Sequence, residues 1–209
     1  MHEKFYWKAK RERKAFLALA DGTVFHGYAF GAKKDTVGEA VFNTGMAGYK
    51  QILTDPSYAG QFVVFTTAEV GAYATNFEKS ESRQVFLNGI VVNSLDWVSK
   101  EQNEESLHDY MLAQGKAGIA GVDTRALTLH LRTHGAQKAY LHVEDSEMSE
   151  EDAIKKAKEW IGLDGQDYAS IVSDPNGYEF STEGKYNVVA LDFGIKTNIL
   201  RDLASQDMK

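Results

Sequence analysis

Short apolar runs separated by turn residues dominate the first third of the chain, and this pattern is typical of β-strands. Residues 16–19 and 23–30 form two such runs, and the dipeptide Asp21-Gly22 between them predicts a two-residue hairpin turn. A hairpin therefore opens the domain. Further strands are predicted at residues 36–44, 61–67, 89–92 and 138–143, of which 61–67 is expected to be buried on both faces.

Residues 39–58, EAVFNTGMAGYKQILTDPSY, hold apolar residues, glycines and an Asp-Pro turn in close succession. Val41 and Phe42 fit a buried strand, and residues 43–45 supply a helix cap and a break. Residues 46–53 then predict a short helix. The expected apolar face of that helix consists of Met46, Tyr49, Ile52 and Leu53.

Residues 54–57 end this stretch and predict a sharp turn. Pro56 fixes its own φ angle and biases Asp55 toward extended geometry, which ends the helix. The Ser57 hydroxyl and nearby backbone amides are thereby placed at an exposed corner. Such a corner is compatible with ligand contact and equally with a simple turn.

Helical periodicity predicts further helices in the middle of the chain. One covers residues 104–113, one covers residues 125–133 after an aspartate or threonine cap, and one runs from a Ser149 capping box to residue 161. The expected buried faces are Leu107, Tyr110 and Met111 in the first, Ala126, Leu127, His130 and Leu131 in the second, and Ile154, Ala157, Trp160 and Ile161 in the third.

The composition changes after residue 163. Residues 164–186 are rich in Asp, Gly, Ser, Asn and Pro and are interpreted as a linker. Residues 187–193 predict a buried strand, and Gly194 gives the turn into a helix that continues to residue 209. Because one strand and one helix cannot bury their own apolar faces, this segment either folds back on the first domain or stays partly exposed.

Length and composition predict a globular protein. The chain has 209 residues and 43% apolar residues, enough for a hydrophobic core in one large domain or in one domain with part of another. No apolar run approaches the roughly twenty residues that a membrane helix needs, and no secretory signal is evident. We therefore expect a soluble, cytoplasmic protein.

The charge balance argues against general binding to nucleic acid or to an anionic membrane. The formal net charge is −7 with an isoelectric point near 5.4, whereas such binders need clustered cationic charge. Residues 8–14 form a basic cluster. We interpret it as a solvated terminal segment, with a localisation or partner-binding tail as the alternative.

Candidate catalytic chemistry is limited by the residues present. The sequence has no cysteine, so disulfides, thiolate metal sites and a cysteine nucleophile are excluded, and no G-x-S-x-G elbow offers a serine instead. His130 and His134 have a spacing that can chelate a metal, but no third ligand is evident and no metal site is predicted. Residues 192–194, Asp-Phe-Gly, lack a glycine-rich phosphate cradle and are interpreted as an ordinary strand-to-helix turn.

Three blocks of sequence resemble one family, in that family's order. Residues 42–61, FNTGMAGYKQILTDPSYAGQ, are similar to the FNT-x-M-T-G-Y-Q-E-x-L-T-D-P-S-Y motif of the glutamine-dependent carbamoyl phosphate synthetase small chain. Residues 118–136, GIAGVDTRALTLHLRTHGA, resemble its G-I-D-T-R-A-L-T-R-x-L-R-x-x-G block. Residues 187–203, NVVALDFGIKTNILRDL, resemble the first strand and helix of its glutaminase domain. The resemblance begins at about Lys14, and residues 71–82 depart from the family pattern.

The resemblance implies an α+β fold, the mixed β/β/α arrangement called swivelling, followed by the start of an α/β glutaminase domain. The implied division is an N-terminal extension at residues 1–14, the small-chain N-terminal domain at 15–163, a linker at 164–186 and the start of a truncated class I glutamine amidotransferase domain at 187–209.

The resemblance also implies a function. In that family the small subunit releases ammonia from glutamine for a large subunit, which uses ATP, Mg and bicarbonate to make carbamoyl phosphate for arginine and pyrimidine biosynthesis. The chain would then form a heterodimer with the large subunit, and no cofactor is expected in the chain itself. Because it lacks the cysteine nucleophile, we expect this chain alone not to hydrolyse glutamine and to act as the docking domain.

Two sets of site residues follow from the resemblance. Ser57 matches the serine of the family's LTDPSY motif, which contributes to the glutamine site, whereas a turn hydroxyl capping a local amide is the alternative. Asp123, Thr124 and Arg125 match the D-T-R triplet and are expected to be structural or to lie at the subunit interface. From the residues alone, Asp123 is a helix cap and Arg125 a guanidinium suited to a carboxylate elsewhere.

Two other functions are compatible with the sequence. A stand-alone scaffold or binding domain could keep the docking surface without catalysis. An independent hydrolase using Ser57 is disfavoured because no base lies near it in the sequence.

Overall fold

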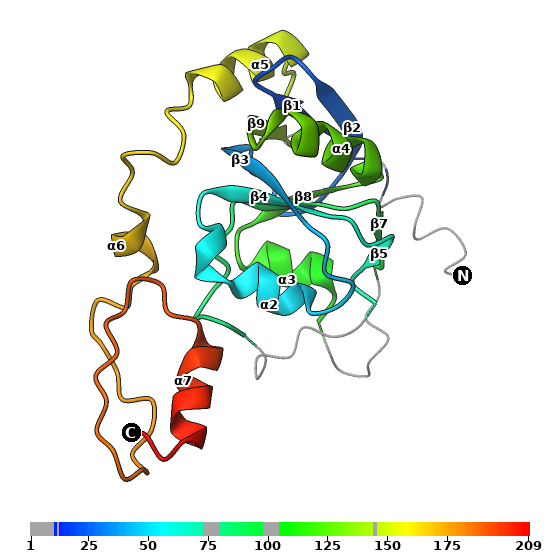
Figure 1. The fold of residues 1–209 in the computed structure, drawn as a ribbon. Coiled ribbons are helices and arrows are strands. Elements are labelled where there is room, and N and C mark those ends of the chain that lie inside the picture. The colour runs from blue at the N-terminus through cyan, green and yellow to red at the C-terminus, as the bar shows by residue number, and fades with distance from the viewer. Residues whose placement is uncertain (1–10, 12, 73–79, 98–104, 144–145) are drawn as a thin grey trace.

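A computed structural model describes residues 11, 13–72, 80–97, 105–143 and 146–209 (Figure 1). Its centre is a closed barrel with the strand order β1-β2-β8-β6-β4-β3-β9. Two short strands form a separate parallel pair. The barrel strands are β1 (Lys14–Leu19), β2 (Val24–Gly31), β3 (Thr36–Asn43), β4 (Gln61–Phe65), β6 (Gly89–Val91), β8 (Ala117–Ala120) and β9 (Gln137–His142), and the pair is β5 (Glu69–Val70) with β7 (Ser94–Leu95).

The strand β1 closes the barrel because it pairs on both edges. It runs antiparallel to β2 and to β9, so that Ala18 lies opposite Val24 on one side and Tyr140 on the other. On the opposite side of the barrel, β3, β4, β6 and β8 are parallel neighbours. Each barrel strand therefore has two partners, which leaves no open sheet edge in the barrel.

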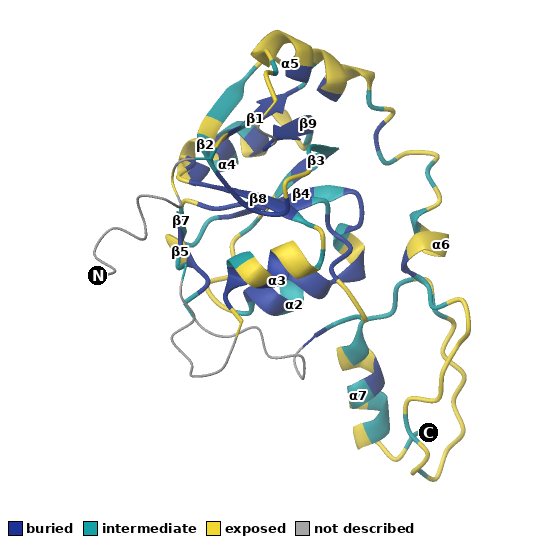
Figure 2. Ribbon diagram, turned by 180° about the vertical axis from the view of Figure 1, so that it is seen from behind, coloured by how far each residue is buried: buried dark blue, intermediate teal, exposed yellow. Residues whose placement is uncertain are grey.

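The parallel strands β4, β6 and β8 are buried on both faces, as the apolar run at residues 61–67 predicts for β4. In β4, Phe62 and Val64 belong to the core cluster inside the barrel, whereas Val63 and Phe65 belong to a second cluster on its outside. Figure 2 shows this concentration of buried residues in the barrel and in the helices beside it. Period-two alternation thus supplies two hydrophobic cores from one strand.

Helices cover the barrel on several sides (Figure 1). The helices α2 (Tyr49–Thr54) and α3 (Leu107–Ala113) pack over the outer cluster, α4 (Thr124–His134) adds Leu127 and Leu131 to the inner cluster, and α5 (Glu150–Glu159) packs Ala153 and Ala157 beside β1 and β9. The remaining helical elements are η1 (Pro56–Tyr58), α6 (Tyr168–Val172) and α7 (Thr197–Ser205). The prediction of a domain that mixes strands and helices is confirmed.

The predicted hairpin is present, but its turn is longer than two residues. The Leu19 amide donates to the Thr23 carbonyl oxygen at 2.8 Å, so that three residues form the loop. Gly22 adopts a φ of 103°, which a glycine tolerates without strain. The extra residue allows a side-chain bond, because the Thr23 amide donates to the Asp21 carboxylate at 2.9 Å.

The helix predicted at residues 46–53 begins later, at Tyr49, and Met46 is 82% exposed instead of buried. Asn43 accepts a hydrogen bond from the Gly45 amide at 2.7 Å, and Gly48 has a left-handed φ of 77°. These two turns delay helix formation. The prediction that Phe42 is buried is also wrong, because Phe42 lies near the end of β3 and is exposed.

The predicted faces of two later helices need correction. In α4 the buried residues are Thr124, Leu127 and Leu131, whereas Ala126 is exposed. A cap at Asp123 sets this face. In α5, Ala153 and Ala157 are buried, but Ile161 is exposed because the backbone turns extended at Trp160 and ends the helix before it.

The buried strand predicted at residues 187–193 is absent, and this prediction is wrong. Val189 is 89% exposed, Leu191 76% and Phe193 73%. A single parallel bridge joins Tyr186 to Met208, and no described strand pairs with residues 189–193. Without a neighbouring strand the ladder cannot form, so the apolar side chains stay exposed, which is one of the two outcomes expected from the sequence.

Residues 164–186 contain a short helix, α6, that packs on the barrel domain. Val172 shares a small cluster with Ala59 and Phe86, and Tyr168 packs against it. The Tyr168 ring occupies the space into which a Cβ on Gly60 would project. Among the described residues, no helix is long and apolar enough to span a membrane.

We predict that Gly60→Ala destabilises the chain more than Gly22→Ala does. Both glycines have positive φ, at 81° and 103°, but a Cβ at Gly60 would lie 2.5 Å from the Tyr168 ring, whereas nothing lies within 4 Å at Gly22. Gly22→Ala should cost about 1–2 kcal/mol of unfolding free energy through backbone strain alone, and Gly60→Ala should exceed that because α6 must move. Urea unfolding of both variants measures the difference. Equal losses of unfolding free energy would contradict the packing of the Tyr168 ring of α6 against Gly60.

Candidate functional site

The turn after α2 presents Ser57 at the surface. Asp55 has extended geometry before Pro56, and its carboxylate accepts a hydrogen bond from the Ser57 amide at 2.9 Å. The backbone of the turn is therefore satisfied by Asp55. Ser57 is exposed, and its hydroxyl makes no hydrogen bond with any described residue. The hydroxyl does not cap a local amide and is available to a ligand.

The segment of residues 80–83 fixes the start of this turn. The Glu81 amide donates to the Thr54 hydroxyl at 2.9 Å, and the Ser82 hydroxyl donates to the Thr54 carbonyl oxygen at 2.5 Å. Thr54 itself is buried, and its hydroxyl donates to the Lys50 carbonyl oxygen. The residue that precedes Asp55 is thus held from both its side chain and its backbone.

A second turn, at residues 192–196, lies against the first. The Asp192 carboxylate accepts hydrogen bonds from the amides of Gly194 at 2.8 Å and Ile195 at 3.0 Å, which shape the turn. Burial alone would raise the pKa of Asp192, but the backbone hydrogen bonds outweigh it and lower that pKa. Gly194 approaches Pro56 so closely that an added Cβ would lie 3.4 Å from the proline Cβ.

An ion pair joins the two turns. Lys196 Nζ lies 2.5 Å from Asp55 Oδ2, with side-chain exposures of 42% and 11%. The hydrogen bond with Asp55 raises the pKa of Lys196, so the lysine is cationic throughout the physiological range. Asp55 therefore binds Ser57 through one oxygen and Lys196 through the other.

Sequence reasoning missed this pair. Lys196 lies in the block that resembles the glutaminase helix, and Asp55 lies in the LTDPSY block, so the family blocks contain both residues. The sequence does not show that these residues, 141 positions apart, are in contact. No local pattern links the turn before β4 to the turn before α7. The Asp55-Pro56 dipeptide is the sequence signal that could have pointed to Asp55.

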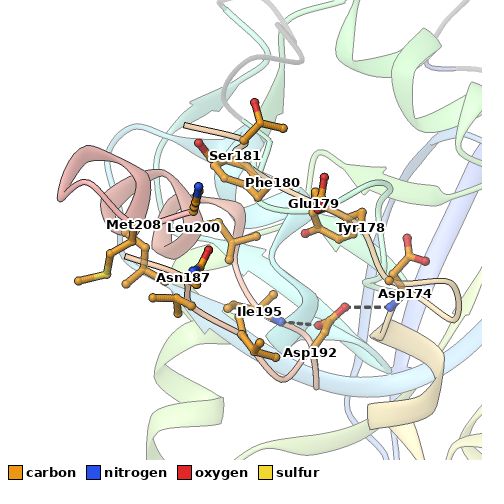
Figure 3. A pocket seen from close by; sticks show the side chains of 17 residues that line it. Asp174, Tyr178, Glu179, Phe180, Ser181, Asn187, Asp192, Ile195, Leu200 and Met208 are labelled. Atoms are coloured by element: carbon orange, nitrogen blue, oxygen red, sulfur yellow. Dashed lines mark hydrogen bonds between the residues drawn. The ribbon is translucent and has the colours of Figure 1, made fainter. Parts of the chain in front are cut away.

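A cavity of about 700 Å³ lies in residues 174–209, called the C-terminal segment below (Figure 3). Asp192 and Asp174 lie at one side of it, where the Asp192 carboxylate accepts the Asp174 amide at 2.8 Å. The other lining residues are mostly apolar and come from the segment itself, including Phe180, Val188, Leu200, Leu203 and Met208. The cavity is therefore enclosed largely by apolar side chains of this segment, one of which, Leu200, is buried.

The D-T-R triplet lies on a different element. Asp123 is the N-cap of α4 and accepts the Ala126 amide at 2.8 Å, Thr124 is buried, and Arg125 is exposed. Arg125 forms no ion pair with any described residue. No hydrogen bond or ion pair of the described part of the chain links these residues to Ser57, so the structure does not bring the two predicted sets together.

The histidine pair of α4 makes contacts with the β1–β2 hairpin and within its own helix. His130 Nε2 lies 2.5 Å from Asp21 Oδ2, and His134 Nδ1 donates to the His130 carbonyl oxygen at 3.0 Å. The two rings are tilted by 33° with their centroids 4.4 Å apart. Across the described ranges no group of three or more His, Cys, Asp or Glu residues is arranged to hold a metal ion. The pair ties the β1–β2 hairpin to α4.

Comparison with known proteins decides the family. The family model described as "Carbamoyl-phosphate synthase small chain, CPSase domain" matches residues 17–141. The chain belongs to the carbamoyl-phosphate synthase small chain family. The chain is 44% identical over 212 residues to the "Carbamoyl phosphate synthase small chain" of Acinetobacter baylyi, covering 93% of this chain and 55% of that protein. The small chain of Thermotoga maritima is 44% identical over 192 residues, covering 91% of this chain and 48% of that protein.

This member of the family spans about half the length of the curated relatives that it matches. A solved aminopeptidase from Aneurinibacillus sp. strain AM-1 aligns with a TM-score of 0.35 and 13% identity, over 65% of this chain and 31% of that one. That likeness is too low to bear on fold or function.

We predict that Asp21→Asn lowers stability near neutral pH and that the difference from wild type disappears in acid. Burial alone would raise the pKa of Asp21, but hydrogen bonds from Thr23 and His130 outweigh it and lower it below 3.8. A lowered carboxyl pKa gives stability that is present above 3.8 and lost as pH falls through the folded-state value. The cost should stay below about 1 kcal/mol, because exposed pairs are screened by water.

Urea unfolding at several pH values between neutral and strongly acidic conditions measures this effect. Asp202→Asn is the matched control, because Asp202 is exposed and its side chain makes no hydrogen bond or ion pair with a described residue. A pH-independent cost for Asp21→Asn would contradict the charge argument.

Proposed function

We propose that this chain supplies one wall of a glutamine site and the large-subunit docking domain of a carbamoyl phosphate synthase small chain. The observation that carries the proposal is the Ser57 hydroxyl, which is exposed and without a partner among the described residues, on a turn that contacts the start of the C-terminal segment. A serine whose hydroxyl stabilises its own turn would support the alternative, and here Asp55 performs that task.

The chemistry of the turn suits an amino-acid ligand. A free hydroxyl both donates and accepts hydrogen bonds, so Ser57 can recognise either the α-ammonium or the α-carboxylate of glutamine. Its backbone is fixed by Asp55, and Asp55 is fixed in turn by Lys196. A preorganised hydroxyl loses little conformational entropy on binding.

Glutamine hydrolysis itself requires groups outside this chain. The sequence offers no cysteine nucleophile, and among the described residues no hydrogen bond joins a histidine to Ser57. A serine without a base is a weak nucleophile, so we assign Ser57 to binding and not to attack. The amidotransferase chemistry would then belong to the continuation that the longer relatives contain.

The second part of the proposal concerns the partner. We assign synthesis of carbamoyl phosphate, for arginine and pyrimidine biosynthesis, to a large subunit that uses ATP, Mg and bicarbonate, and we assign docking to the barrel domain. Arg125 supports this assignment, because it is exposed at the start of α4 and its guanidinium is free to pair with a carboxylate of a partner. Asp123 holds the helix start that presents it.

A stand-alone scaffold function is the second candidate. One observation favours it: the barrel is closed on itself and has its own inner core, so it does not need the C-terminal segment in order to bury its strands. Such a domain could bind a partner without taking part in catalysis.

We predict that Ser57→Ala, in a complete small chain paired with its large chain, raises the KM for glutamine by roughly fivefold to tenfold. Loss of one hydrogen bond to a bound ligand corresponds to about 1 kcal/mol or slightly more. Synthesis from free ammonia should not change, because ammonia bypasses the glutamine site. Steady-state kinetics with both nitrogen donors measures the two activities.

Ser205→Ala is the matched control for this experiment, because Ser205 is exposed at the end of α7 and its hydroxyl bonds only to Asp202 in the same helix and to the adjacent Gln206. An unchanged KM for glutamine in Ser57→Ala would refute the binding role. A loss of both activities would indicate damage to the fold instead.

We predict that the purified chain forms a defined complex with a carbamoyl phosphate synthase large chain from a close relative. The barrel domain is closed and should present its docking surface without the rest of the small chain. Light scattering of each protein alone and of the mixture gives the masses. Arg125→Glu should weaken the complex, because the reversed charge would repel a partner carboxylate. A chain that stays monomeric in the mixture would favour the scaffold function.

A further inference from the structure

We propose that Glu81 is a positioning residue that sets the glutamine-binding turn of the barrel against the helix α7. The inference rests on the proposed function, because it concerns the site to which Ser57 is assigned. Glu81 does not touch the proposed ligand position. It acts through Thr54 on one side and through the first turn of α7 on the other.

The contacts of Glu81 join the two sides directly. Its amide donates to the Thr54 hydroxyl at 2.9 Å, immediately before the Asp55 turn. Its carbonyl oxygen accepts the Thr197 amide at 2.9 Å, and its carboxylate accepts the Asn198 amide at 3.0 Å. One residue therefore uses its backbone donor, its backbone acceptor and its side chain to connect segments that lie far apart in the sequence.

The start of α7 depends on this residue. The N-cap Lys196 makes no side-chain capping bond, whereas α3, α4, α5 and α6 are each capped by their own N-cap side chain. The first amides of a helix lack internal partners and carry partial positive charge, so they favour a carboxylate. In α7 the carboxylate comes from a residue 117 positions away, which makes the cap a tertiary contact.

Neighbouring contacts restrict the remaining freedom of α7. Arg201 donates to the Ser80 carbonyl oxygen at 3.2 Å, one helical turn from the Glu81 cap, and Lys196 pairs with Asp55. Arg83 donates to the Val172 carbonyl oxygen at 2.9 Å at the end of α6. Residues 80–83 therefore contact the ends of α2 and α6 and the start of α7, and hold these three elements in one arrangement.

This arrangement determines where the two turns of the site lie. Ser57 belongs to the barrel, whereas the Lys196 turn belongs to the C-terminal segment, and no backbone ladder joins them. The Asp55–Lys196 pair, the Arg201 bond to Ser80 and the Thr197 bond to the Glu81 carbonyl oxygen hold the start of α7 together with the Glu81 carboxylate. The carboxylate is the contact that completes the first turn of the helix, so its loss should loosen the Lys196 turn relative to Ser57 and weaken ligand binding.

The experiment uses the complete small chain paired with its large chain. We expect Glu81→Ala to raise the KM for glutamine by roughly fivefold, about the effect of losing one helix cap, and to change the maximal rate less. Synthesis from ammonia should not change. Glu81→Gln keeps an oxygen that can accept the Asn198 amide and should restore most of the lost affinity. Glu159→Ala is the control, because Glu159 lies on α5 in an exposed pair with Lys155 at 3.9 Å.

Hydrogen exchange of the peptide covering residues 195–205 gives a readout that does not depend on activity. Glu81→Ala should speed exchange in the first turn of α7, whereas Ser57→Ala should leave it unchanged. Unchanged exchange and unchanged KM in Glu81→Ala, with a raised KM in Ser57→Ala, would overturn this inference and leave the proposed function standing. A raised KM in Glu81→Ala with no effect of Ser57→Ala would support Glu81 and refute the role of Ser57.

A purely structural role for Glu81 predicts a different pattern. Glutamine-dependent and ammonia-dependent synthesis would then fall together, and Glu81→Gln would not restore affinity. That outcome would also overturn the positioning role.

Discussion

Closure of the barrel by the pairing of β1 with β9 is the constraint on which the remaining structure depends. Because every barrel strand has two neighbours, the strand ends are fixed in space, and the loops that leave them start from defined positions. The parallel neighbours β3, β4 and β6 leave the barrel in the same direction. Site residues therefore lie on loops that a rigid scaffold holds, although the loops themselves contain little regular structure.

The scaffold and the candidate site are held by different forces. Apolar burial holds the barrel, through an inner cluster and an outer cluster that share the strand β4. Directional polar contacts hold the site: the Asp55–Lys196 pair, the Glu81 cap and the bonds to Thr54. Polar contacts of this kind add little net stability but specify one arrangement, since any other leaves charged or hydrogen-bonding groups unsatisfied. A binding turn needs that specificity more than it needs stability.

The sequence predicts those features whose causes are local. The hairpin at Asp21-Gly22, the capping box at Ser149, the extended geometry of Asp55 and the doubly buried β4 all depend on neighbouring residues, and the structure contains each of them. Local competition explains the errors as well. The helix near Met46 starts late because the Asn43 side chain and the left-handed Gly48 favour turns, and periodicity alone does not weigh such alternatives.

The contacts that position the site have causes far apart in the chain, and no sequence pattern reports them. Glu81 lies in residues 71–82, which depart from the family pattern, and its contacts are visible only because folding brings this segment to the start of α7. Ser57 could be singled out from the family motif, but the motif does not say whether its hydroxyl is already used. The structure supplies that observation, since Asp55 and not Ser57 satisfies the turn.

In the C-terminal segment, polar contacts act without the apolar burial that stabilises the barrel. Its helix is held to the barrel by polar contacts at Lys196, Asn198 and Arg201, while its predicted strand lies exposed. An isolated parallel bridge joins Tyr186 to Met208, which precede and follow α7 in the chain as the strands of a parallel α/β crossover would, although neither residue belongs to a strand. A crossover buries its apolar faces only within a wider sheet, so the polar contacts can orient α7 before any such burial. The position of α7 relative to Ser57 and the burial of the residues predicted as a strand are thus set by independent interactions.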